Sequence, residues 1–278
     1  MILSDSRHAV PTMLLLSMLS GLLFSPQGMA QTTPGIERVD NSTLPSGNGL
    51  AARFTSDAKL TAHPSVIFSD DFETGELGER WDEANDRNGN VLSFADPASK
   101  HPGLGQRSLK VTATLGQNSG GGLTKWFESA DRLFLRFYTK FDPDCDYVHH
   151  FCTLRANKSL RGGDRWSGFG GAGELPAGDA RFSTAIEPWG NWGKWICVEF
   201  MIAHNTPGQD DGEQAYWIDG ELRGHWRGIS WRTSPTLMAN AFTLESYVTD
   251  RWTQQRVNIV YFDNVVIAKE YIGPLARP

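Results

Sequence analysis

The 278-residue sequence contains little cysteine, no excess of positive charge and no long apolar run. Its 26 Lys and Arg residues are outnumbered by 32 Asp and Glu residues, which gives a net charge of −6. A nucleic-acid partner requires a positive electrostatic field, so this charge balance argues against one. The hydrophobic fraction of 40% is too high for a disordered chain. The sequence therefore predicts a folded protein, and its length suits one large all-β domain better than two small ones.

The three cysteines, Cys145, Cys152 and Cys197, match no zinc-binding spacing. Their odd number also leaves at least one thiol without a disulfide partner. We expect all three to be small buried hydrophobic residues that take no part in chemistry.

The first thirty residues have the pattern of a secretory signal peptide. Arg7 and His8 form a weak basic region, and Met13–Phe24 is an apolar run of 12 residues, too short for a membrane-spanning helix. Gly28 and Ala30 occupy the small-residue positions of a cleavage site. We expect cleavage after Ala30, no membrane span in the mature chain, and a secreted or periplasmic protein. An uncleaved membrane anchor is the alternative.

The rest of the chain divides into a leader and a β domain. Residues 31–62 are rich in Thr, Ser, Gly, Asn and Pro without apolar periodicity, which predicts a flexible leader. From residue 63 to residue 278, short β-branched and aromatic runs alternate with turn residues, and no helical period is sustained. This pattern predicts an all-β fold, a two-sheet antiparallel jelly-roll sandwich. The expected strands are 66–72, 91–95, 108–115, 123–127, 132–141, 147–155, 181–187, 194–204, 214–218, 221–226, 241–248 and 257–269.

Several of these strands carry hydrophobic residues at alternate positions and Arg, Tyr, His, Glu or Lys at the positions between them. The polar face has two interpretations. It is either a solvated outer sheet, which any antiparallel strand can present, or a concave groove that holds a polysaccharide. Its aromatic and ionic residues favour the groove. The polar positions include Arg136, Tyr138, Lys140, Glu245 and Tyr247.

Tryptophan is abundant, with 10 residues, and Trp189 and Trp192 lie in one short Gly-containing segment. Exposed in a loop, these two side chains would form a stacking surface for sugar rings. Alternatively, they fold over the edge of the sandwich. On the first interpretation, Trp189, Trp192, Glu245 and Tyr247 bind the substrate.

Three segments carry a family resemblance: Ile67–Trp81 (IFSDDFETGELGERW), Arg132–Asp142 (RLFLRFYTKFD) and Tyr261–Pro274 (YFDNVVIAKEYIGP). Together they resemble the concanavalin A-like lectin/glucanase jelly-roll superfamily. The middle segment is similar to the long strand of alginate- and glucuronan-type polysaccharide lyases. The resemblance implies a polysaccharide partner that is anionic, and β-elimination of a uronate-containing chain without a catalytic cofactor.

A lyase must neutralise the uronate carboxylate, remove the proton on the neighbouring carbon, and return a proton to the leaving oxygen. Arg, Tyr and His can fill these roles. Because the link between the strands over 132–141 and 147–155 is short, we expect the two strands to pair as a hairpin and bring such residues together. The candidate catalytic residues are Arg136, Tyr138, Lys140, Tyr147, His149 and Arg155.

Acidic residues in the first and last strands have two interpretations: a structural metal site, or ordinary turn and edge residues. The two strands are expected to pair, which would bring Asp71, Glu73 and Asp263 together. An oxygen-rich site of this kind suits Ca²⁺.

Retaining glucanases of the same superfamily place two carboxylates at alternate positions of one strand, in an E-x-D-x-E run. No such run occurs in this sequence, so a hydrolase is less favoured than a lyase or a binding protein. Two alternatives to a lyase stay open: a non-catalytic lectin-like domain and a structural surface protein.

Overall fold

A computed structural model describes residues 35–78, 80–86, 91–95, 104–117, 119–146, 148–156, 181–186, 193–251 and 255–276. Of residues 149, 150 and 181–186 it describes the backbone. All of these residues belong to one compact unit, Pro34–Pro278. No helix within the described ranges is long and apolar enough to cross a membrane.

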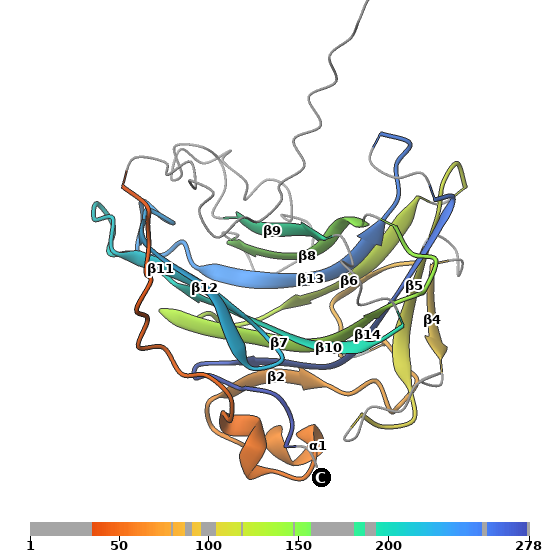
Figure 1. Ribbon diagram of the computed structural model, residues 1–278, viewed down its shortest axis with the longest axis horizontal. Coiled ribbons are helices and arrows are strands. Elements are labelled where there is room, and N and C mark those ends of the chain that lie inside the picture. The colour runs from red at the N-terminus through yellow and green to blue at the C-terminus, as the bar shows by residue number, and fades with distance from the viewer. Residues whose placement is uncertain are drawn as a thin grey trace, which may run out of the picture. The chain divides into compact units, whose positions relative to one another are not determined.

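Two antiparallel sheets stack to form the predicted sandwich (Figure 1). The nine-stranded sheet has the order β1-β12-β11-β10-β7-β14-β5-β4, with β2 also paired to β14, and the five-stranded sheet has the order β3-β6-β13-β8-β9. The strands of the larger sheet are β1 (Glu37–Arg38), β2 (Val66–Asp70), β4 (Leu92–Ala95), β5 (Ser108–Thr114), β7 (Arg132–Phe141), β10 (Trp195–Ala203), β11 (Gly212–Ile218), β12 (Glu221–Ile229) and β14 (Val257–Ala268). Those of the smaller sheet are β3 (Glu83–Asn85), β6 (Gly120–Trp126), β8 (Val148–Ala156), β9 (Arg181–Ile186) and β13 (Ala239–Tyr247).

Every strand expected from the alternation is present, and the all-β jelly-roll prediction is confirmed. The first and last of them, β2 and β14, pair as expected. The structure adds β1 and β3, which are two and three residues long. Strands this short contain too few positions for alternation to identify them.

The main core lies between the two sheets, where the hydrophobic positions of the alternating strands meet. From β7, Leu135 and Phe137 point inward, and from β13, Phe242 and Leu244 do so. The Phe137 and Phe242 ring centroids lie 6.1 Å apart. Cys145, Cys152 and Cys197 are buried, as predicted, and all three are free thiols.

A second hydrophobic cluster covers the other face of the nine-stranded sheet. The 3-10 helix η1 (Leu50–Arg53) and the short helix α1 (Asp57–Leu60) pack there. Leu50 and Leu60 are fully buried beside Trp217 and Ile272. The expectation of a flexible leader is therefore corrected for residues 35–62. This segment supplies the apolar cover that the larger sheet needs on its outer side, and it carries no periodic pattern because only a few of its residues are buried.

Candidate functional site

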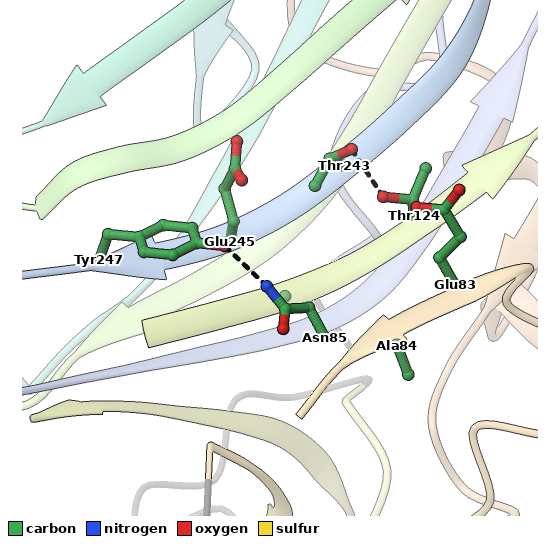
Figure 2. Close-up of a pocket in the computed structure, with 8 residues that line it drawn as sticks. Glu83, Ala84, Asn85, Thr124, Thr243, Glu245 and Tyr247 are labelled. Atoms are coloured by element: carbon green, nitrogen blue, oxygen red, sulfur yellow. Dashed lines mark hydrogen bonds between the residues drawn. The ribbon is translucent and has the colours of Figure 1, made fainter. Parts of the chain in front are cut away.

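The outer face of the five-stranded sheet carries a polar cavity of about 180 Å³ (Figure 2). Three neighbouring strands, β3, β6 and β13, provide its walls. Carboxylates, hydroxyls, one amide and one phenol converge on it, which is the usual composition of a site that orients a polar ligand. The lining residues are Glu83, Ala84, Asn85, Gly122, Thr124, Thr243, Glu245 and Tyr247.

Strand alternation places the β13 side chains of this site. Phe242 and Leu244 point into the core, so Thr243, Glu245 and Tyr247 point to the opposite face. Glycines of β6 lie directly opposite two of them in the register, Gly122 beside Glu245 and Gly120 beside Tyr247. A Cβ atom at Gly122 would collide with the Leu244 carbonyl oxygen and lie 2.7 Å from the Glu245 Cβ. The glycines therefore leave the space that the cavity occupies.

Hydrogen bonds fix the orientation of the lining side chains. The Asn85 amide donates a hydrogen bond from Nδ2 to the phenol oxygen of Tyr247, with a distance of 3.0 Å, as Figure 2 shows. The Thr153 hydroxyl donates to the Glu245 carboxylate over 2.8 Å. Tyr247 and Asn85 are half-buried, whereas Glu245 is buried. The phenol and the amide thus form a hydrogen-bonded pair that keeps part of its surface exposed to solvent.

Three residues expected from the sequence come together on this face. Glu245 and Tyr247 line the cavity, and Arg155 on β8 donates a hydrogen bond to the Thr243 hydroxyl over 2.8 Å. The Arg155 side chain is only 2% exposed. It therefore lies beside the cavity on the same face of the sheet and contacts the site through Thr243.

The prediction that a polysaccharide groove contains Arg136, Tyr138 and Lys140 is wrong for the outer face of the five-stranded sheet, because none of the three lines it. All three lie on β7 in the nine-stranded sheet, and all three are buried. Arg136 pairs with Asp57 of helix α1, and the Tyr138 hydroxyl accepts a hydrogen bond from the Leu275 backbone over 2.8 Å. The alternation assigned them correctly to a non-core face, but the second hydrophobic cluster covers that face.

These residues have pKa values that follow from their burial. Burial raises the pKa of the Tyr138 phenol well above its usual range. Burial lowers the pKa of the Lys140 ammonium, although nearby Asp142 opposes this effect. The Lys140 Nζ atom lies 4.5 Å from the Tyr261 ring centroid and 5.3 Å from that of Trp195, so it is held by aromatic faces.

The expected hairpin between the β7 and β8 strands is also wrong, because the two strands belong to different sheets. β7 pairs with β10 and β14, whereas β8 pairs with β13 and β9. His149 lies on β8, in the same sheet as the cavity, and its side chain is outside the described part of the structure. Tyr147, Trp189 and Trp192 also lie outside the described residues.

The residues predicted to bind calcium lie near one another without forming a cage. Among the described residues, no three His, Cys, Asp or Glu side chains are arranged to hold a metal ion. The Glu73 carboxylate accepts hydrogen bonds from the backbone N–H groups of Gln106 and Arg107. Asp263 accepts one from the Asn264 N–H group over 2.8 Å, and Asp71 accepts one from Glu73. The side chains present therefore do not fit the expected three-carboxylate calcium site.

Sequence reasoning missed the β3 contribution, Glu83 and Asn85. Both residues belong to a three-residue strand in a segment that shows no alternation. Their part in the site depends on long-range pairing, in which Asn85 lies opposite Gly122 of β6. The Gly120–Gly122 run on an otherwise regular strand was the available signal, because consecutive glycines in a strand mark a close approach of other groups.

A larger cavity of about 370 Å³ lies beside β2 and the end of β6. Its Lys125 forms an ion pair with Asp82 over 3.1 Å and lies above the Phe68 ring. Val66, Ile67 and Phe127 supply much of its remaining wall. Because these apolar residues supply much of its wall and its Lys125 is already paired, the smaller cavity on the sheet face is the better candidate for recognition of a polar ligand.

Comparisons with known proteins support the fold. No protein-family model and no curated protein sequence matches the chain. Among solved structures it is similar to endo-β-1,4-glucuronan lyase from the fungus Trichoderma reesei, with a TM-score of 0.51 and 16% identity over 73% of this chain and 95% of that one. It also matches an alginate lyase from Chlorella virus, with a TM-score of 0.45 and 14% identity over 74% of this chain and 100% of that one. An alginate lyase from Aplysia kurodai matches with a TM-score of 0.43 and 10% identity over 81% of this chain and 97% of that one. The fold is the jelly roll found in the glucuronan lyase, as the sequence resemblance implied.

Proposed function

We propose that the protein is an exported lyase that binds a uronate-containing polysaccharide on the outer face of the five-stranded sheet and cleaves it by β-elimination. The observation that carries the proposal is the hydrogen-bonded pair of Asn85 and Tyr247 in the cavity of that face. The jelly-roll fold, which glucuronan lyase shares, supports the same reaction class.

The chemistry assigns a role to each member of the pair. The carboxyl-bearing carbon of a uronate, C5, loses its proton readily only when the neighbouring carboxylate is neutralised. The Asn85 amide, which already donates one hydrogen to Tyr247, has a second hydrogen to donate to that carboxylate. Tyr247 is the group that exchanges protons, since a phenol can act as a general base or acid.

The elimination step then balances as follows. Tyr247, as phenolate, takes the C5 proton, and the C5–H electron pair forms the C4=C5 double bond. The C4–O4 bond breaks, and its electrons leave with the O4 oxygen of the departing chain. The phenol O–H returns the proton to that oxygen, which regenerates the phenolate. Glu83 and Glu245 accept hydrogen bonds from sugar hydroxyls and so hold the ring in place.

The proposal is tested by incubating the mature protein with polyglucuronate, polymannuronate and polyguluronate. The ultraviolet absorbance of the new C=C bond, which is conjugated with the carboxylate, reports elimination. We expect absorbance to rise with at least one polymer. If every polymer is retained by the protein and none yields unsaturated product, the lectin-like alternative replaces the lyase.

A further inference from the structure

The nine-stranded sheet has more strands than its partner, and its β1-β12-β11 end lies at the side where the smaller sheet ends with β9 (Figure 1). The inner face of this end is identified by Tyr216, which packs against the core between the sheets. Its neighbours Ala215 and Trp217 belong to the cluster on the opposite face. Tyr216 and the residues paired with it therefore look toward the five-stranded side of the molecule.

Two aromatic side chains on this inner face stack on each other. The Tyr216 and Trp226 ring centroids are 5.9 Å apart, and the ring planes are within 9° of parallel. Gly224 lies opposite Tyr216 in the register and makes this possible. A Cβ atom at Gly224 would collide with the Trp226 ring and lie 2.8 Å from the Tyr216 ring. We call Tyr216, Gly224 and Trp226 the aromatic platform; both of its rings are half-buried, so each keeps part of its surface in solvent.

Polar side chains flank the platform on the same face. Gln214 of β11 and Arg38 of β1 are the register partners of Trp226 on its two sides, and directly paired residues share a face. Arg38 is exposed. No hydrogen bond or ion pair joins the Arg38 guanidinium or the Gln214 amide to any residue that the structure describes. By contrast, Arg227 on the opposite face of β12 pairs with Glu213 over 3.1 Å.

We propose that the aromatic platform, with Arg38 and Gln214, is a second binding site for an anionic sugar. A pyranose ring stacks on Trp226 and Tyr216, the Arg38 guanidinium binds its carboxylate, and the Gln214 amide binds a hydroxyl. The ring face that remains exposed in this stacked pair suits a flat ligand, and an arginine beside it selects one that carries a negative charge. This inference rests on the proposed function, because it assumes that the polymer is a polyuronate.

The two sites face the same way. In a two-layer sandwich, the outer face of one sheet and the inner face of the other point in one direction, so the platform on the inner face of the nine-stranded sheet and the cavity on the outer face of the five-stranded sheet face the same way. The platform lies one layer lower, which is a step of about 10 Å between packed sheets. A long chain bound in the cavity can therefore extend over the β9 side onto the platform, whereas a short oligosaccharide cannot occupy both sites.

The test measures retention of the full chain in gels that contain polyglucuronate, together with its KM on long polymer and on a trisaccharide. Trp226→Ala should weaken polymer retention about tenfold, as expected for the loss of an aromatic contact. It should raise KM on long polymer and leave kcat and the trisaccharide KM unchanged. Gly224→Ala, which keeps both rings but displaces them, should have the same effect. Arg38→Gln should weaken retention at low salt and have no effect on carboxyl-reduced polymer.

The controls separate this inference from the proposed function. Circular dichroism and thermal melting confirm that each variant is folded, and Arg227→Gln, on the opposite face of the same strand, should leave retention unchanged. Equal retention and equal KM for wild type, Trp226→Ala and Gly224→Ala would overturn the platform while leaving the lyase intact. If wild type yields no unsaturated product and platform variants still lose retention, the lyase fails and the platform stands.

Discussion

The carboxylate of Asp57 in helix α1 lies 2.7 Å from the Arg136 guanidinium on β7, and both side chains are buried beneath the segment that precedes β2. The same Asp57 oxygen accepts a hydrogen bond from the Asn264 amide over 2.7 Å. The acidic side chain therefore ties the N-terminal segment to two strands of the nine-stranded sheet. Burial is the largest single effect and acts to lower the pKa of Arg136, but the charge and hydrogen bond of Asp57, together with Cys197 and Tyr138, outweigh it and raise that pKa.

Removal of one partner should destabilise the fold. Asp57→Ala leaves a buried guanidinium without its counter-charge, so we expect the free energy of unfolding to fall by about 3–5 kcal/mol. Urea denaturation measures the change. The double variant Asp57→Ala/Arg136→Met removes both charges and should recover part of the loss. An Asp57→Ala protein as stable as wild type would show that the pair does not hold the segment in place.

The Asp263 carboxyl should make stability depend on pH. Burial raises its pKa to about 9, the charges of Glu73, Asp71 and Asp57 add to this effect, and the hydrogen bond from Asn264 opposes it. The unfolded chain titrates near 3.8, so between about pH 4 and pH 9 the folded state holds the additional proton. This group's stabilising contribution is full below pH 4 and is lost as the pH rises toward 9.

Asp263→Asn mimics the protonated form and should remove this pH dependence. Melting temperatures from pH 4 to pH 9 should fall for wild type and change less for the variant. Calcium and a chelator provide the control, since a cation could neutralise the same carboxylate. A calcium-dependent rise in melting temperature that Asp263→Asn abolishes would show that a metal ion, and not a proton, compensates this charge.

The cysteines should be unreactive in the folded protein. Burial raises the pKa of Cys145 to about 12 and raises those of Cys152 and Cys197 far above the usual thiol range. The thiolate is the nucleophile, so alkylation by iodoacetamide at pH 8 should be negligible for native protein and should modify all three residues after unfolding. Mass spectrometry counts the adducts. Rapid modification of a native thiol would contradict the burial of that residue.

Local alternation predicted the strands and the direction of their side chains, but it did not predict what covers each face. On β7 it separated Phe137 from Arg136 and Tyr138 correctly. Whether the second face is open depends on where residues 35–62 and the C-terminal segment pack, and this is decided by long-range contacts such as that between Leu50 and Tyr271. Alternation also predicted that Glu245 and Tyr247 lie on a polar face, and both line the cavity on the outer face of β13. Among the described residues, no packed segment fills that cavity.

Two tyrosines therefore offer a matched test of the site. Tyr247→Phe removes the proton-exchanging hydroxyl in the cavity, and we expect turnover of polyuronate to fall by about 10²–10⁴-fold, the usual effect of losing a positioned acid or base. Because Tyr247 is half-buried on the outer face, the melting temperature of the Tyr247→Phe protein should change little.

Tyr138→Phe removes a hydroxyl that accepts the Leu275 N–H hydrogen bond far from the cavity, in the other sheet. That variant should lose stability by about 1 kcal/mol and keep its turnover. Initial rates of unsaturated product and thermal melts of both proteins provide the measurements. Full activity in the Tyr247→Phe protein, or lost activity with unchanged stability in the Tyr138→Phe protein, would move the chemistry away from the five-stranded sheet, because only a catalytic hydroxyl separates rate from stability in this way.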